Sequence, residues 1–310
     1  MFCQDEQGCG SVALSFFNHN PCPASAFSQQ TVSKYRRMSL GASRSPHDRW
    51  GRGDAYEPFV GRWSRLVAQE FLKWLTLPPK SLWLDIGSGT GALSQVIIND
   101  SDPSFVAGLD RSEEYVRFAR SRVIDVRAAF EVGDAMRLPV RAGAFDAAVS
   151  GLALNFVPQP SDMVSEMRRA IRAGGIVAAY VWDYSSKMEL LRYFWDAVAS
   201  VDPAALELDE GRRFPICDPV LLHDLFQKCD LSNVEAIPID IETRFRDFDD
   251  YWTPFLGGQG PAPSYTMSLP EEARIRVRNK IHESLPITAD GSIRLIARAW
   301  AVKGSKRVEK

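Results

Sequence analysis

The sequence predicts a doubly wound α/β fold with a mostly parallel sheet. Short apolar segments typical of strands alternate with stretches whose apolar residues recur at helical spacing. The first strand runs directly into a loop with three alternating glycines and then into a helix, over residues 82–98, LWLDIGSGTGALSQVII. In such a sheet the strands are joined by right-handed crossovers, and ligands bind beyond the carboxyl ends of the strands.

The composition excludes several classes of protein. Hydrophobic residues make up 45% and charged residues 25% of the 310 residues, which indicates a globular chain rather than a disordered or membrane protein. The net charge of −2 lacks the basic excess of nucleic-acid-binding proteins, so we expect no nucleic-acid partner. No apolar run reaches the length of a membrane span. The five cysteines lack C-x-x-C spacing, so we expect neither disulfides nor a metal site, and a cytoplasmic location follows by default.

The two ends of the chain differ from its centre. Residues 1–45 are rich in Ser, Gln, Asn and Gly without any periodicity, which predicts a disordered extension. Met38 opens a stretch that resembles a natural protein start, and we take it as the candidate translation start. Residues 46–304 form the predicted domain, and residues 305–310 form a basic tail.

An amphipathic helix over Glu57 to Leu77 precedes the sheet, because its apolar residues recur every three or four positions. After Pro78-Pro79 the strands begin. Helices between them start near Gly91, Ser112 and Ser161, and the last of these is expected to end at Gly174-Gly175. The five predicted strands of this part are Leu82–Ile86, Phe105–Leu109, Ala129–Val132, Phe145–Val149 and Ile176–Trp182.

Two further strands complete a sheet of seven. They cover Val234 to Thr243 and Ser292 to Val302, after helices near Met188 to Val201 and Pro219 to Lys228. About 45 residues separate the two strands, far more than a hairpin loop contains. This insertion, residues 245–291, holds an aromatic-rich piece, a GGQGPAP segment and a helix near 270–285. We interpret it as a lid that contributes to an acceptor site.

The glycine loop is compatible with two kinds of cofactor. Gly87, Gly89 and Ala92 fit the dinucleotide fingerprint G-x-G-x-x-G/A, and Asp110 stands where that fingerprint expects a ribose-binding acid. Asp85 argues against a dinucleotide, because its carboxylate would lie beside the pyrophosphate in a partly dry cleft. A ligand that carries positive charge at this point would be stabilised instead.

The segment Asp85 to Gly91, DIGSGTG, resembles the D/E-x-G-x-G-x-G signature of class I S-adenosylmethionine-dependent methyltransferases. The resemblance implies a Rossmann-like sheet with an antiparallel last strand and S-adenosyl-L-methionine as the cofactor. Tyr56 to Ser64 resembles the entry helix of small-molecule methyltransferases, including quinone C-methyltransferases, where this helix covers the cofactor. The resemblance spans about residues 51–304.

The resemblance also assigns cofactor contacts. Asp85 faces the methionine portion, beside the backbone of Gly87, Ser88 and Gly89. Asp110 binds the ribose hydroxyls and Arg111 and Ser112 lie beside the adenosine, while Asp134 and Ala135 meet the adenine. Ser150 opens the segment after the fourth strand that passes the sulfonium, and Arg62 belongs to the entry helix.

No convincing general base emerges. The nearest candidates are Asp183 and Tyr184 after the fifth strand and Tyr251 and His282 in the insertion. We therefore expect a methyltransferase for a small, partly apolar acceptor. A non-catalytic S-adenosylmethionine-binding protein and an NAD(P)- or FAD-dependent oxidoreductase are the alternatives. The methylated atom type and the oligomeric state stay open.

Overall fold

The computed structural model describes residues 57–258 and 260–308. The predicted disordered extension and the candidate start at Met38 lie outside the described residues. The chain forms a seven-stranded sheet in the order β3-β2-β1-β4-β5-β7-β6. Pairing is parallel from β3 to β5, while β7 runs antiparallel to both of its neighbours, β5 and β6. The predicted doubly wound sheet with an antiparallel last strand is confirmed.

The strands lie where the apolar segments predicted them. Their bounds are β1 Leu82–Ile86, β2 Phe105–Asp110, β3 Ala128–Val132, β4 Phe145–Gly151, β5 Ile171–Trp182, β6 Leu231–Phe245 and β7 Ile293–Lys306. The strand order reverses between β1 and β4, because β2 and β3 lie on one side of β1 and the later strands lie beyond β4. A crevice for ligands is expected at this switch point, and the glycine loop directly follows β1.

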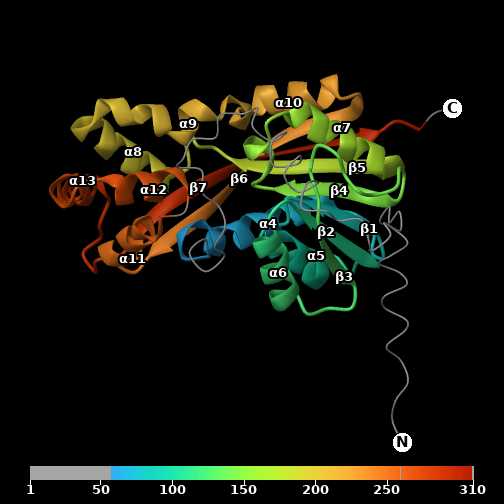
Figure 1. Cartoon of the computed structure of the whole chain (residues 1–310), viewed down its shortest axis with the longest axis horizontal. Helices are drawn as coiled ribbons and strands as arrows, with labels where there is room; N and C mark the ends of the chain where they lie inside the picture. Colours follow the sequence, from blue (N-terminus) through green and yellow to red (C-terminus); the bar gives the residue numbers. More distant parts are fainter. Residues whose placement is uncertain (1–56, 259, 309–310) are drawn as a thin grey trace, which may run out of the picture.

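Helices cover both faces of the sheet (Figure 1). One side carries η1 (Glu57–Gly61), α4 (Arg62–Leu75), α5 (Ala92–Asp100) and α6 (Glu113–Arg122). The other side carries α7 (Pro160–Ala170) and α10 (Pro219–Lys228). The helix α4 has the predicted amphipathic pattern, since Val67, Ala68 and Phe71 on one face are fully buried. None of the described helices is both long and apolar enough to cross a membrane.

The insertion forms a helical layer at one end of the sheet, to the left in Figure 1. It contains α11 (Phe248–Trp252), η5 (Thr253–Gly257), α12 (Pro261–Ser268) and α13 (Glu271–Ser284). The layer packs on α8 (Glu189–Val201), where the ring of Phe255 stacks on that of Phe194 at 4.7 Å. Shorter elements between α8 and α10 are η3 (Pro203–Leu208), α9 (Glu210–Arg213) and η4 (Pro215–Cys217). Another short one, η2 (Leu154–Phe156), follows β4.

The predicted end of α7 is wrong. The helix ends at Ala170, and Gly174-Gly175 lie inside β5 rather than at a helix C-cap. The pairing of β4 with β5 shifts register at this point, and Gly174 has a φ of +75°. A Cβ on Gly175 would lie 2.7 Å from the Asp146 carbonyl oxygen, so the glycines allow an irregular strand start. The last strand is also longer than predicted and takes in residues 305 and 306 of the basic tail.

Candidate functional site

A cavity of about 1100 Å³ opens at the carboxyl ends of the central strands. Small-molecule sites usually measure about 300–1000 Å³, so the cavity has room for a cofactor and a second molecule. Its walls come from the glycine loop, from the ends of β2, β3, β4 and β5, and from η1 and α4. The lining residues used below are Val60, Ser64, Asp85, Gly87, Ser88, Gly89, Asp110, Arg111, Ser112, Asp134, Ala135, Leu152, Ala153, Phe156, Tyr180, Trp182 and Tyr184.

The glycine loop is held by close packing. Gly87 has a φ of +71°, and a Cβ there would lie 2.4 Å from the Cβ of Ala153, so no larger residue fits without displacing the segment after β4. The N–H groups of Gly87 and Ser88 both donate to the Leu109 carbonyl oxygen, at 2.8 and 2.9 Å. These two N–H groups are therefore already hydrogen-bonded, and the loop meets a ligand with its bare backbone surface.

Asp85 is buried at the end of β1, with 1% of its surface exposed. Its Oδ2 accepts a hydrogen bond from the Ser94 hydroxyl at 2.7 Å, whereas its Oδ1 has no partner among the described residues. Burial raises the pKa of Asp85 to about 7, against the lowering effect of the Ser94 hydrogen bond. A buried carboxylate oxygen without a partner costs free energy, so a cationic group bound beside it would be stabilised.

Asp110 ends β2 and organises the neighbouring backbone. Its Oδ2 accepts from the Gly89 N–H at 2.9 Å and its Oδ1 from the Ser112 N–H at 2.8 Å. Burial raises the pKa of Asp110, and these backbone hydrogen bonds oppose that effect. Ser112 also caps α6 by accepting from the Tyr115 N–H. Asp110 thus connects the glycine loop to the start of α6, and it also lines the cavity.

The remaining predicted cofactor residues fall into two groups. Arg111, Asp134 and Ala135 line the cavity; Asp134 is exposed, and its Oδ1 accepts from the Met136 N–H at 2.9 Å. Ser150 is fully buried, its hydroxyl has no partner among the described residues, and it is not part of the lining.

Arg62 lies away from this cavity. It lines a separate pocket of about 370 Å³ beside the insertion. Its guanidinium donates to Asp250 Oδ1 at 3.0 Å and lies 4.4 Å from the centroid of the Trp63 ring. The structure therefore connects Arg62 to the insertion rather than to the cofactor end of the cavity.

The four general-base candidates do not come together. Tyr184 lines the cavity. Asp183 is buried in a turn, where its Oδ1 accepts from the Ser185 hydroxyl and the Ser186 N–H. The hydroxyl of Tyr251 is buried and donates to the Leu190 carbonyl oxygen at 2.7 Å, and exposed His282 packs its ring on Phe248. The structure places only Tyr184 of these four at the cavity.

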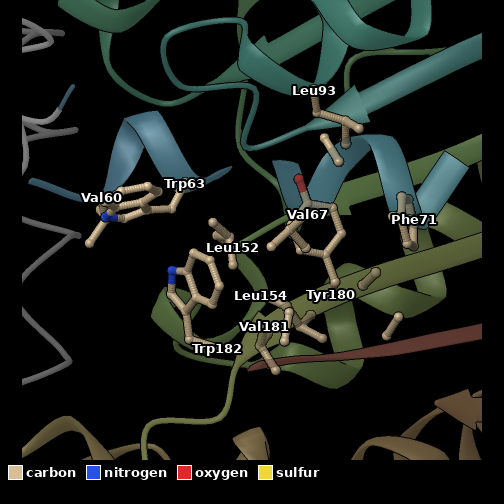
Figure 2. Close-up of a cluster of buried hydrophobic side chains, with 14 of the residues drawn as sticks. Val60, Trp63, Val67, Phe71, Leu93, Leu152, Leu154, Tyr180, Val181 and Trp182 are labelled. Carbon is tan, nitrogen blue, oxygen red and sulfur yellow. The ribbon is translucent and has the colours of Figure 1, made fainter. Parts of the chain in front are cut away.

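Sequence reasoning missed the residues on the β5 side of the cavity. Tyr180 and Trp182 are two positions apart on β5, so their side chains point to the same face, toward α4. The ring of Phe71 in α4 lies 4.7 Å from that of Tyr180. Figure 2 shows Trp182 beside Leu152, with Val60 and Trp63 across from them. Strand alternation was the available signal, but buried aromatics of this kind usually belong to a core.

The predicted lid residues do not reach the cavity. Among the described residues, none of those that line it belongs to the insertion 245–291. The insertion instead supports the wall from behind, since Phe255 contacts Phe59 at 5.4 Å, directly before the lining residue Val60.

Comparison with known proteins finds a matching family model for the central part of the chain. Residues 84–179 match the family model described as a methyltransferase domain. The chain is 32% identical over 122 residues to 2-methyl-6-phytyl-1,4-hydroquinone methyltransferase of Synechocystis sp., covering 39% of this chain and 38% of that protein. It is 28% identical over 219 residues to tRNA (carboxymethyluridine(34)-5-O)-methyltransferase alkbh8 of Xenopus tropicalis, covering 66% of this chain and 33% of that protein. The chain thus spans well under half the length of these two relatives.

A solved structure with the same fold contains the expected cofactor. It is phosphoethanolamine N-methyltransferase 2 of Haemonchus contortus in complex with S-adenosyl-L-methionine, with a TM-score of 0.51 at 16% identity. The match covers 82% of this chain and 56% of that one, and at this identity it speaks for the fold alone.

Proposed function

We propose that this chain, which belongs to the class I S-adenosylmethionine-dependent methyltransferases, transfers a methyl group to a small, partly apolar molecule. Family membership is confirmed by the domain match over residues 84–179 and by the fold. S-adenosyl-L-methionine, the cofactor of the family, supplies a methyl group activated by a sulfonium. The names of the two relatives reported above include different acceptors, a hydroquinone in one and a tRNA in the other.

The proposal rests mainly on Asp85, whose buried Oδ1 has no partner among the described residues and which lines a cavity large enough for two molecules. The residues of this chain fit the cofactor. Asp85 holds the cationic methionine end, Asp110 accepts from the ribose hydroxyls, and Asp134 with Ala135 meets the adenine. Ser150, which is not part of the lining, is no longer proposed as a direct contact.

Methyl transfer is an in-line displacement, in which the bond from carbon to sulfur breaks as the bond to the acceptor forms. The protein has to align the two molecules and exclude water, and a general base is needed only where the acceptor holds its proton tightly. The walls formed by η1, α4 and β5 provide this enclosure. Tyr184 is the one predicted general-base candidate that lines the cavity, and its phenol is the group we propose to orient the acceptor.

Two observations favour a small molecule over RNA. Arg111 is the only Lys or Arg among the described residues that line the cavity, and the whole chain has a net charge of −2. Binding to a phosphate backbone requires several cations along a surface. Neither a non-catalytic cofactor-binding protein nor an oxidoreductase would transfer the methyl group, so a methyl-transfer assay distinguishes both alternatives from the proposed function.

The test is transfer of radiolabelled methyl groups from S-adenosylmethionine into a cell extract, separated into small-molecule, RNA and protein fractions. We expect the label in organic-extractable small molecules. Label in the RNA fraction would contradict the proposed acceptor class, and no transfer despite cofactor binding would favour the non-catalytic protein. The Asp85→Asn variant serves as the low-activity control.

A further inference from the structure

The cavity is charged on one side only. Asp85, Asp110, Arg111 and Asp134 all lie at or just beyond the carboxyl ends of β1, β2 and β3. Among the described lining residues contributed by η1, α4, β4, β5 and the segment after β4, none carries a charge. These residues are Val60, Ser64, Gly151, Leu152, Ala153, Phe156, Val157, Pro158, Gln159, Tyr180 and Trp182. We call this set, together with Tyr184 directly beyond β5, the uncharged half.

The uncharged half is rich in aromatic rings whose positions are fixed. Tyr180 is held by Phe71, and its hydroxyl occupies the space over Gly151, where a Cβ would lie 2.5 Å from the hydroxyl oxygen. Phe156 and Tyr184 are both backed by Phe214, at 5.0 and 5.9 Å between ring centroids. Trp182 is buried, with 2% of its surface exposed, and lies beside Leu152 (Figure 2). Such rings cost little entropy when they bind a second ring.

We infer that the part of the acceptor buried here is an uncharged aromatic ring, which lies in the uncharged half beneath α4, where the ring of Phe156 is partly exposed and Trp182 and Leu152 back the wall. This inference rests on the proposed function and narrows its substrate class. A charged group placed in this half would lose its hydration without gaining an ionic partner, which is costly. Flat aromatic walls favour an aromatic ligand over a saturated one, because offset and edge-to-face ring contacts add to the burial of area.

The Ser64 hydroxyl supports the same conclusion. It donates to the Gly61 carbonyl oxygen at 2.7 Å within the start of α4, so this hydrogen is already used inside the protein. Ser64 therefore leaves the polar contacts of the acceptor to Tyr184, whose phenol we propose to orient it, and to the charged half, where the methyl group arrives, while the ring fills the uncharged half.

The experiment uses four matched probes with the protein saturated in S-adenosylhomocysteine: 1-naphthol, 1-naphthoate, 1-naphthylmethylamine and decahydro-1-naphthol. Calorimetry measures each affinity. We expect 1-naphthol to bind at least about tenfold more tightly than the anion and the cation, since burying an unpaired charge costs more than about 1.4 kcal/mol. We expect the saturated analogue to bind about three- to tenfold more weakly than 1-naphthol.

The variants Trp182→Leu and Phe156→Leu should weaken 1-naphthol binding about two- to tenfold and leave the affinity for S-adenosylhomocysteine unchanged. Trp74→Leu is the matched control, because Trp74 belongs to α4 but does not line the cavity. If Trp182→Leu does not fold, Phe156→Leu carries the test. A preference for the charged or saturated probe, or no 1-naphthol binding, overturns the inference. Failure of S-adenosylhomocysteine itself to bind would overturn the proposed function instead.

Discussion

The two halves of the cavity are built from different kinds of side chain. In the charged half, Asp85 and Asp110 are held in place by hydrogen bonds from Ser94, Gly89 and Ser112. In the uncharged half the walls are rings packed on other rings, such as Tyr180 on Phe71. The first arrangement suits a molecule with fixed charges and hydroxyls, and the second suits a flat apolar one. This difference separates the expected effects of substitutions on cofactor and on acceptor.

The largest effect is expected for Gly87→Ala. The new Cβ would lie 2.4 Å from that of Ala153 while the residue keeps a φ of +71°. Both halves meet at this point, so we expect more than about a hundredfold loss of affinity for S-adenosylhomocysteine, measured by calorimetry, and a lower melting temperature.

Gly143→Ala is the control for backbone strain alone. Gly143 has nearly the same φ, +70°, but nothing lies within 4 Å of its Cβ position. It should cost about 1 kcal/mol in stability and leave binding unchanged. Equal losses of binding in both variants would show that strain, rather than contact with Ala153, accounts for the effect.

Asp85→Asn is expected to weaken binding of S-adenosylmethionine about ten- to hundredfold, because a hydrogen bond or ion pair to a charged group is lost. The loss should be larger for S-adenosylmethionine than for S-adenosylhomocysteine, which lacks the sulfonium charge. Asp100→Asn, at the exposed end of α5, is the matched control. An unchanged affinity of the Asp85→Asn variant for S-adenosylmethionine would show that the Asp85 carboxylate does not contact the cofactor.

The pH dependence of stability and of cofactor affinity tests the role of Asp85. Its pKa is raised from 3.8 to about 7 by burial, so between these values the folded protein binds a proton that the unfolded chain releases. Stability of the free protein should therefore fall as the pH rises from about 4 to about 7, by at most about 1.4 kcal/mol per pH unit from this group. Cofactor affinity should rise with pH up to and through this pKa, by about tenfold between pH 6 and 8.

Asp110 and Glu210 are also buried acids whose pKa is raised, so the effect of Asp85 has to be measured against Asp85→Asn. Burial also raises the pKa of Glu210 to about 7, and its effect on stability has the same sign. Only the difference between the wild type and Asp85→Asn in thermal unfolding at several pH values isolates Asp85. Identical pH profiles for cofactor binding in the two proteins would contradict an ionised Asp85 as the cofactor ligand.

The smallest effect is expected for Asp250→Asn. This change removes the ion pair of 3.0 Å with Arg62 at the start of α4, where the side chains are 30% and 16% exposed. We expect a two- to threefold rise in KM for the acceptor with unchanged affinity for S-adenosylhomocysteine. Asp249→Asn, which loses an exposed pair with Arg278, is the control. A larger effect on the cofactor than on the acceptor would contradict a role of the insertion in supporting the uncharged half.

The charged half could be predicted from sequence because its residues follow local rules. Asp85, Asp110 and Asp134 each lie at or just beyond the carboxyl end of an apolar strand, and parallel strands bring such positions to one edge. The uncharged half could not, because Val60, Leu152 and Trp182 come from three separate segments and look like ordinary core residues. For the same reason an aromatic insertion looked like a lid, whereas Phe255 and Tyr251 fill the layer behind the wall.

The most direct test of the central claim is a calorimetric titration of the wild-type chain at pH 8 with S-adenosylhomocysteine, NAD⁺, NADP⁺ and FAD. We expect saturable one-to-one binding of S-adenosylhomocysteine in the micromolar range and no binding of the dinucleotides. Binding of a dinucleotide without S-adenosylhomocysteine would contradict the account, because its pyrophosphate would have to lie against the glycine loop beside Asp85.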